Sequence, residues 1–340
     1  MKIPYRTRQN LLRFGLIALI VAVVAGLVFF CWFTWLERYV IYTREEGAII
    51  DMGLPPGVAL GEEALPESTK ETVSIYYNEG ENAINVSKDL VQMVGYYATA
   101  ADLEKSVSDV FNQAKALPSG TPVMLDVKSP KGNFFYSTSV SSHTNPDIDL
   151  AQVDKMIAEL DKKGIYLIAR IPALRDYYFG LEKTANGLFV ASGSHLWADD
   201  DYCYWLNPSS EGTITYLAQI VTELKNIGFD EVVFDEFRFP DTDNLKFEGD
   251  RNEALTNTAN ILVSSCATDN FAVSFVGKAE FPLPEGRARL YVTEGTAAEV
   301  DSIAQQTGLS DPAIHLVFLT ENHDTRFEAY SVLRPLEAAH

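Results

Sequence analysis

The chain has 340 residues, the length of one (β/α)8 barrel of ~250 residues with an appendage, or of two domains of ~150 residues each. With 47% hydrophobic and 22% charged residues, its composition is globular and excludes a mainly disordered or collagen-like chain. The net charge of −20 argues against nucleic acid as a partner, because binding a phosphate backbone requires a basic face. Three cysteines are too few for a fold built on disulfides.

The N-terminal part of the chain predicts a membrane anchor. Residues 14–36 form a run of 23 uncharged, mostly apolar residues, which as a helix would span the ~30 Å hydrocarbon layer. Only basic charged residues precede the run: Lys2, Arg6, Arg8 and Arg13. We therefore expect a single-pass protein of the cell membrane, with residues 1–13 cytoplasmic and the C-terminal domain extracytoplasmic. A cleaved signal peptide is the alternative, but its apolar run would be ~7–15 residues long and would end in small residues.

The rest of the chain divides into a spacer and a domain. Residues 37–73 are acidic and rich in Pro and Gly, which predicts an extended spacer. Within residues 74–340, short apolar runs predict strands at Val91–Ala98, Thr121–Val127, Ile165–Ile171, Glu231–Phe237 and, more weakly, Phe271–Val276, Arg289–Thr293 and Ile314–Thr320. Apolar residues at helical spacing lie between the first four runs, near residues 103–114, 150–160 and 214–224.

This alternation of strands and helices predicts an α/β fold with a parallel sheet. Its length fits a closed (β/α)8 barrel of the TIM type better than an open sheet. The weaker strand pattern of the C-terminal half leaves open that the barrel is degenerate there. No Gly-x-Gly-x-x-Gly or Walker loop follows any predicted strand, which leaves a dinucleotide-binding or P-loop fold unsupported.

Charged residues follow three of these apolar runs, at the point where each strand ends. The groups are Asp126 with Lys128, Arg170 with Asp176, and Asp235 with Glu236 and Arg238. In (β/α)8 barrels the carboxyl ends of the strands meet at one mouth, where the chemistry takes place. We therefore expect Asp126, Arg170 and Asp235 to converge. A structural ion pair of Arg170 with either aspartate is the alternative explanation for these charges.

Four segments carry a resemblance to a known family. They are VMLDVKSPKGNFFY (Val123–Tyr136), KKGIYLIARIPALRDYY (Lys162–Tyr178), YWLNP (Tyr204–Pro208) and GFDEVVFDEFRFP (Gly228–Pro240). In this order and spacing they resemble the putative glycoside hydrolase family of (β/α)8 barrels, over about residues 91–240. The resemblance implies a barrel that acts on a cell-envelope or other polysaccharide.

Glycoside cleavage requires a carboxylic acid that protonates the leaving oxygen and a carboxylate that acts as nucleophile or base. The resemblance places Asp235 at the rim as the first catalytic carboxylate, with Glu236 or Asp126 as its partner. On an extended strand Asp235 and Glu236 face opposite sides, so they cooperate only if the backbone leaves extended geometry. Further residues are expected to bind the sugar: Lys128, Arg170, Arg238, Trp205, Tyr97, Tyr136 and Asp176.

Two departures from the family pattern support a second hypothesis. The family usually has Tyr where this chain has Glu236, and the segment at residues 275–277 lacks the expected aspartate. The alternative is therefore a catalytically inactive barrel that binds carbohydrate or serves as an envelope scaffold. A further carboxylate near Asp235 would favour the enzyme, and the later strand ends offer Glu280, Glu294 and Glu321.

The remaining polar features have simpler interpretations. The five histidines show no metal-ligand spacing, so we expect neither a metal nor a cofactor. The residues Asp199, Asp200 and Asp201 predict a solvated turn rather than a calcium site. Asp230 and Glu231 are expected in water at the opposite rim of the barrel. Cys203 and Cys266 could form a disulfide in an external domain or remain free.

Overall fold

The computed structural model describes residues 40–43, 47–50 and 90–336. Contacts divide the chain into two units, residues 1–83 and 84–340. In the first unit, β1 (Val40–Thr43) and β2 (Gly47–Ile50) form an antiparallel hairpin inside the predicted spacer. Among the described residues, no helix has both the length and the hydropathy needed to cross a membrane. The predicted anchor at residues 14–36 lies outside the described residues.

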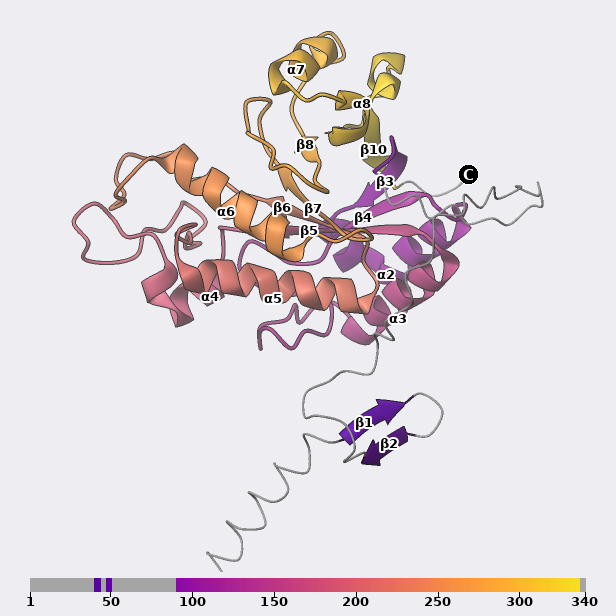
Figure 1. Cartoon of the computed structure of the whole chain (residues 1–340), viewed down its shortest axis with the longest axis horizontal. Coiled ribbons are helices and arrows are strands. Elements are labelled where there is room, and N and C mark those ends of the chain that lie inside the picture. The colour runs from indigo at the N-terminus through magenta and orange to yellow at the C-terminus, as the bar shows by residue number, and fades with distance from the viewer. Residues whose placement is uncertain (1–39, 44–46, 51–89, 337–340) are drawn as a thin grey trace, which may run out of the picture. The chain divides into compact units, whose positions relative to one another are not determined.

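The second unit is a closed barrel of eight parallel strands, which confirms the predicted fold (Figure 1). Each strand pairs with the next along the chain, and the last pairs with the first. The strands are β3 (Val94–Ala98), β4 (Pro122–Asp126), β5 (Tyr166–Pro172), β6 (Glu231–Asp235), β7 (Ala272–Val276), β8 (Leu290–Val292), β9 (Leu316–Leu319) and β10 (Ser331–Pro335).

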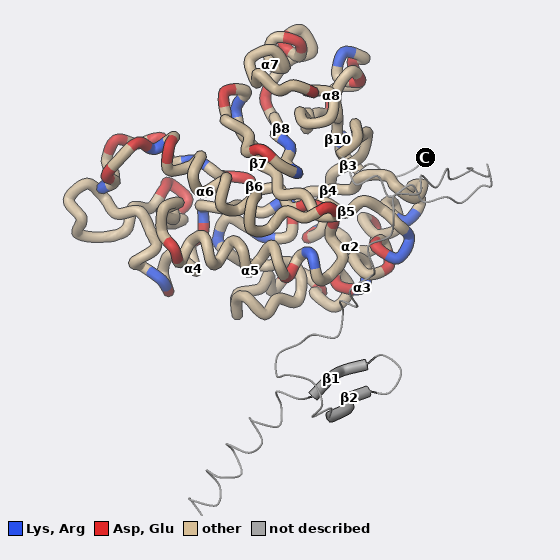
Figure 2. Tube along the Cα trace, viewed as in Figure 1, with Lys and Arg blue, Asp and Glu red and all other residues tan. Residues whose placement is uncertain are grey.

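Helices cover the outside of the barrel. They are α2 (Ala100–Ala116), α3 (Leu150–Lys163), α4 (Tyr177–Glu182), α5 (Glu211–Ile227), α6 (Arg251–Cys266), α7 (Val300–Thr307) and α8 (Pro312–His315). Local sequence explains their ends: α3 begins at the N-cap Asp149, whose side chain accepts from the N–H of Gln152, and ends at Gly164 with φ +78°. Figure 2 shows that charged residues lie mostly on these helices and on the loops.

Two elements were not predicted from the sequence. Strand β10 closes the barrel, but it is short and contains Arg334 and Pro335, so its sequence lacks the apolar run that predicts a strand. Helix α6 has an inner face made partly of small and polar residues, including Ala254, Thr258 and Ala259, so no clear apolar stripe marks it.

The interior of the barrel is built in layers. Its middle layer is apolar and contains Met124, Ile168, Val233, Val317 and Leu333 from five strands. Because side chains alternate along a strand, residues two positions further along also point inward. On β4, β5 and β6 these residues are Asp126, Arg170 and Asp235, so the pleat directs all three to the same end of the barrel.

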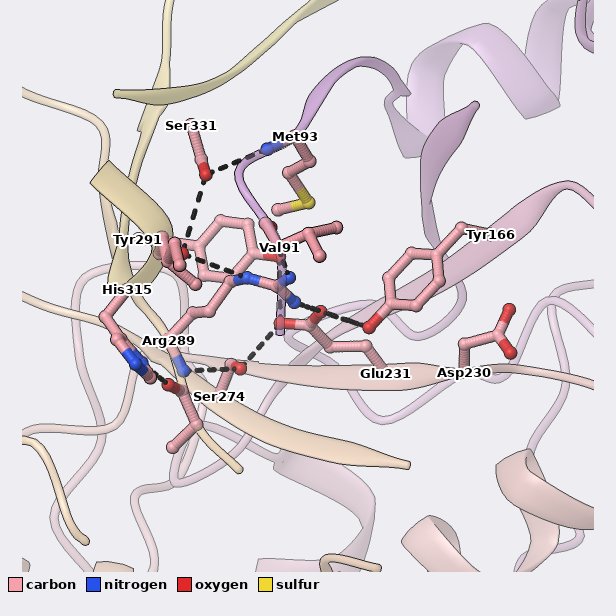
Figure 3. A network of polar contacts seen from close by, with 12 residues as sticks. Val91, Met93, Tyr166, Asp230, Glu231, Ser274, Arg289, Tyr291, His315 and Ser331 are labelled. Atoms are coloured by element: carbon pink, nitrogen blue, oxygen red, sulfur yellow. Dashed lines mark hydrogen bonds and ion pairs between the residues drawn. The ribbon is translucent and has the colours of Figure 1, made fainter. Parts of the chain in front are cut away.

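The layer at the opposite end corrects the expectation for Glu231. Its side chain is fully buried rather than solvated and forms an ion pair of 2.5 Å with Nη1 of Arg289 (Figure 3). The hydroxyls of Tyr166, Ser274 and Tyr291 donate hydrogen bonds of 2.9, 2.6 and 2.9 Å to the same carboxylate. A buried charge requires such partners, so this network closes the floor of the barrel.

Candidate active site

The carboxyl end of the barrel brings the three predicted charged groups together. Nε of Arg170 lies 2.8 Å from Oδ1 of Asp126 and 3.6 Å from Oδ2 of Asp235. The guanidinium also donates from Nη2 to Oδ2 of Asp126 at 3.3 Å. All three side chains retain some exposure, with 23% for Arg170, 12% for Asp126 and 29% for Asp235. The expected convergence at one mouth is therefore present.

Asp126 is the most enclosed member of this group. The backbone N–H of Ala100, at the start of α2, donates to Oδ2 of Asp126 at 3.0 Å. Burial raises the pKa of the Asp126 carboxyl above its usual value, although Arg170 and the Ala100 N–H act in the opposite direction. A carboxyl in this environment is suited to hold a proton that it can donate.

The backbone changes direction immediately after Asp235. Glu236 has φ +48°, in the left-handed region that residues with a side chain rarely adopt. Its N–H donates to Oδ1 of Asp235 at 2.7 Å, and the carbonyl of Asp235 accepts from the N–H of Ala173 at 2.7 Å. The chain therefore leaves extended geometry, which is the condition under which Asp235 and Glu236 can face the same site.

Two arginines contact Glu236. Nη2 of Arg238 lies 2.8 Å from its Oε2, and Nη1 of Arg175 lies 3.9 Å from its Oε1. Arg175 was not among the predicted site residues, although it lies inside the segment that carries the family resemblance. Its position three residues after the end of β5 was the feature of the sequence that could have identified it as a site residue.

Trp205 is buried beside the mouth and contacts Arg238 and Asp199. The residue is 2% exposed, and Cζ of Arg238 lies 4.9 Å from the centroid of its ring. Its Nε1–H donates to Oδ2 of Asp199 at 3.0 Å. The prediction that Trp205 stacks on a sugar is therefore corrected, because the ring is occupied by protein groups.

Lys128 and Asp176 form a second buried support. Both side chains are fully buried and lie 2.8 Å apart, and Lys128 also donates to the carbonyl of Pro172 at 3.0 Å. Asp176 caps α4 through the N–H of Phe179 and accepts from the hydroxyl of Tyr216 at 2.9 Å. Neither Lys128 nor Asp176 has the exposure needed to contact a sugar, which corrects their predicted binding roles.

The two predicted tyrosines have different positions. Tyr136 is fully buried, and its hydroxyl donates to Glu223 at 3.0 Å, so its role is packing rather than sugar stacking. Tyr97 is half-buried at the end of β3. Burial and the nearby charge of Glu321 raise its pKa, with Arg170 opposing them. Of the carboxylates after the later strands, Glu321 is thus close enough to the mouth for its charge to raise the pKa of Tyr97.

The remaining predictions concern metals and cysteines. Within residues 90–336 and the hairpin, no three His, Cys, Asp or Glu side chains gather as a metal site. The Asp199 and Asp201 carboxylates instead each lie 2.6 Å from Arg175. Cys203 and Cys266 are free, so the disulfide left open by the sequence is absent.

A cavity of about 600 Å³ opens at the other end of the barrel. Its lining includes Leu90, Thr268, Arg287 and His315, all of which precede strands in the chain. It therefore belongs to the amino-terminal face, whereas the strand ends that carry Asp126 and Asp235 form the opposite one. Because barrel chemistry takes place at the carboxyl ends, the mouth remains the candidate active site.

Comparisons with known proteins extend this description. A family described as "Putative glycosyl hydrolase domain" matches residues 95–279. A hypothetical protein from Ruminiclostridium thermocellum is similar in structure at 19% identity and a TM-score of 0.45, covering 53% of this chain and 96% of its own. A cycloisomaltooligosaccharide glucanotransferase from Paenibacillus sp. has 10% identity and a TM-score of 0.49, with 67% of this chain covered. An α-galactosidase from Lactobacillus brevis has 11% identity and a TM-score of 0.47, with 74% covered.

The chain spans 38% of the length of the glucanotransferase and 38% of that of the α-galactosidase. A search of curated proteins found no match.

Proposed function

Because the chain belongs to the family of putative glycosyl hydrolase domains, we propose that it hydrolyses a glycosidic bond of a polysaccharide at the carboxyl-terminal mouth of its barrel. One observation carries the proposal. The side chains of Asp126 and Asp235, from two different strands, contact the same nitrogen of Arg170. Hydrolysis of a glycosidic bond requires at least two carboxyl groups near the bond, and this partly exposed position provides two.

The separation of the two carboxyls favours retention of configuration. Since Oδ1 of Asp126 and Oδ2 of Asp235 lie 2.8 and 3.6 Å from Nε of Arg170, they are at most 6.4 Å apart. Retaining enzymes hold their carboxyls about 5–5.5 Å apart, whereas inverting enzymes need about 6.5–9.5 Å to fit a water. In a retaining mechanism one carboxylate bonds to the anomeric carbon. We assign that role to Asp235 and the role of the acid to Asp126, because burial raises the pKa of Asp126.

The different surroundings of Asp126 and Asp235 suit them to different steps of the reaction. Asp126 has a raised pKa and gives its proton to the leaving oxygen as the carbon–oxygen bond breaks. Asp235 then forms the ester, which water hydrolyses while Asp126 takes the proton from that water. Arg170 compensates the negative charge that remains on the two carboxyl groups. At the mouth, the carboxylate of Glu236 accepts hydrogen bonds from sugar hydroxyls, and the hydroxyl of Tyr97 donates or accepts them.

The cellular setting is also a proposal. The uncharged run at residues 14–36 and the basic residues before it support a membrane anchor with a cytoplasmic N-terminus. With such an anchor the barrel would face a cell-envelope or extracellular polysaccharide. Protease treatment of intact and permeabilised cells tests the topology, since only an extracytoplasmic barrel is digested in intact cells.

One observation favours the second candidate, a carbohydrate-binding barrel without turnover. Arg170 already makes contacts of 2.8 and 3.3 Å with Asp126, so a structural ion pair satisfies this carboxyl in the absence of substrate. In that case the mouth would bind a glycan through Arg238, Glu236 and Tyr97 without cleaving it.

Release of reducing sugar from isolated envelope glycans distinguishes the two candidates. We expect the full-length protein to release sugar, and Asp235→Asn and Asp126→Asn each to lower the rate at least 100-fold. Asp109→Asn, an exposed position on α2, is the matched control and should keep full activity. NMR of the first product checks for retained anomeric configuration. Glycan binding without release by the unaltered protein would support the inactive barrel instead.

A further inference from the structure

Tyr202 combines exposure with an unfavourable backbone. Its side chain is 80% exposed, and its φ is +60°. Among the described residues, Tyr202 and Glu236 are the non-glycine positions with positive φ. A left-handed conformation is costly for a residue with a side chain, and an exposed ring gains no packing that would compensate. An observed outlier of this kind, close to a candidate active site, calls for a functional reason.

The turn that carries Tyr202 is held firmly. Oδ1 of Asp199 accepts from the N–H groups of Asp201 and Cys203 at 3.0 and 2.9 Å. The N–H of Tyr202 donates to the carbonyl of Asp199 at 3.0 Å. Arg175 contacts the carboxylates of Asp199 and Asp201 at 2.6 Å each. The backbone of Tyr202 is therefore fixed on both sides, which lowers the entropy lost when the ring binds a ligand.

The same turn is joined to the mouth of the barrel. Nη1 of Arg175 lies 3.9 Å from Oε1 of Glu236, so one guanidinium contacts both the turn and the residue after Asp235. Asp199 also accepts from Nε1 of Trp205, whose ring lies under Arg238. A ligand that extends from the mouth past Arg175 would thus reach the Tyr202 turn next.

Charge restricts the chemistry of that ligand. Asp200 is exposed next to Tyr202, and the side chain of Asp201 is 74% exposed although it pairs with Arg175. The loop after β6 adds exposed Asp241 and Asp243, and Figure 2 shows acidic segments on the loops near α4 and α6. An anionic sugar would be repelled here, whereas a neutral or amine-bearing sugar would not.

We propose that Tyr202 is the stacking platform of an outer sugar subsite beside the mouth, which binds a neutral or amine-bearing pyranose of the polysaccharide. The inference rests on the proposed function. The C–H face of a pyranose is weakly positive and apolar, and it matches the negative face of a tyrosine ring. The pyranose bound here belongs to the same chain as the bond to be cleaved, so the subsite holds the polymer in register with Asp235.

Binding in a variant without turnover tests the subsite separately from catalysis. In full-length Asp235→Asn protein, we measure affinity by titration calorimetry for hexasaccharides of glucose, of N-acetylglucosamine, of glucosamine and of galacturonic acid. We expect at least one neutral or amine-bearing hexasaccharide to bind and the galacturonic acid hexamer not to bind. Adding Tyr202→Ala or Tyr202→Gly should weaken that binding about tenfold, whereas Tyr202→Phe should change it less than threefold.

The melting temperature separates a binding role from a structural one. Tyr202→Gly relieves the positive φ, so its melting temperature should equal or exceed that of the parent while its affinity falls. Ile261→Ala, which removes a side chain of 45% exposure from α6, is the control and should leave affinity unchanged. Unchanged affinity in the Tyr202 variants, or preference for the galacturonic acid hexamer, would overturn the inference while leaving the proposed function standing. Failure of all four probes to bind would overturn the inference, because three of them present the neutral or amine-bearing pyranose that it names, while release of sugar from envelope glycans tests the proposed function separately.

Discussion

Asp126 and Arg170 occupy paired positions on the neighbouring strands β4 and β5, and their side chains meet inside the barrel at 2.8 Å. Asp235 approaches the same guanidinium from β6 at 3.6 Å. One guanidinium therefore contacts both carboxyl groups, and it lowers the pKa of Asp126 against the raising effect of burial. The relationship follows from the alternation of side chains, since all three residues point inward near the carboxyl ends of neighbouring strands.

The first prediction removes that cation. In Arg170→Met, the two carboxyls face each other without compensation, and the free energy of unfolding at pH 7 should fall by about 1–3 kcal/mol. The pKa of Asp126 is already raised in the folded protein, and loss of Arg170 raises it further. Below the pKa of Asp126 in the unfolded chain, the carboxyl is protonated in both states and its ionisation costs no stability. The cost develops as pH rises through the pKa of Asp126 in the folded protein. The loss should therefore be smaller at pH 4 than at pH 7, as measured by urea unfolding.

Arg326 provides the control for this experiment. It pairs with Asp324 at 2.7 Å, but its side chain is 52% exposed. Because exposed ion pairs contribute little, Arg326→Met should unfold at nearly the same urea concentration as the unaltered protein at both pH values. An equal loss in the two variants would mean that Arg170 has no special part in holding the mouth together.

The second prediction concerns the floor of the barrel. Arg289→Met leaves the carboxylate of Glu231 buried without its cation, and this should cost about 3–5 kcal/mol of unfolding free energy. The double variant Glu231→Gln with Arg289→Met removes both charges and should recover part of the loss, because the amide oxygen can accept from Ser274 and Tyr291 while the amide NH2 donates to the hydroxyl of Tyr166. A urea-unfolding cycle of the two single variants and the double variant measures the coupling. Additive losses would contradict a coupled buried pair.

The third prediction uses the neighbouring Asp230. Burial raises the pKa of its carboxyl from 3.8 to about 6, although the N–H of Leu167 donates to it at 2.8 Å. A raised pKa in the folded state contributes stability that is fully present below pH 3.8 and is lost as pH rises through 6. This corresponds to about 2–3 kcal/mol of unfolding free energy.

Asp230→Asn should remove that dependence, since the amide oxygen can still accept from Leu167 without ionising. The difference in unfolding free energy between the variant and the unaltered protein should shift in favour of Asn between pH 4 and pH 7. A difference that stays constant with pH would show that Asp230 does not titrate in this range.

Periodicity explains why much of the fold and the centre of the site were predictable. The apolar runs predicted seven of the eight barrel strands, β3 to β9, in chain order, and the charged residues after three of them marked the mouth. Inward direction needs only the alternation of side chains along a strand, so the convergence of Asp126, Arg170 and Asp235 could be argued from sequence alone.

What the sequence could not decide was which polar groups find partners inside the protein. Glu231 was expected in water because its buried partner, Arg289, directly precedes β8, which lies two strands away from β6 in the barrel. Lys128 and Tyr136 were taken for sugar contacts, since a sequence does not reveal that Asp176 and Glu223 occupy them. These pairings depend on three-dimensional neighbours, which no local pattern encodes.

The last prediction concerns the backbone at Glu236, where φ is +48°. Replacement by Gly and by Ala both remove the contacts with Arg238 and Arg175, so the two variants differ mainly in backbone freedom. Glu236→Gly should be more stable than Glu236→Ala by about 1 kcal/mol, because only glycine adopts this conformation without strain. If Glu236 also orients substrate, both variants should lose glycan hydrolysis to a similar extent despite this difference in stability. Urea unfolding and sugar release measure the two effects separately, and an Ala variant as stable as the Gly variant would argue that the backbone there relaxes to negative φ once the side chain is gone.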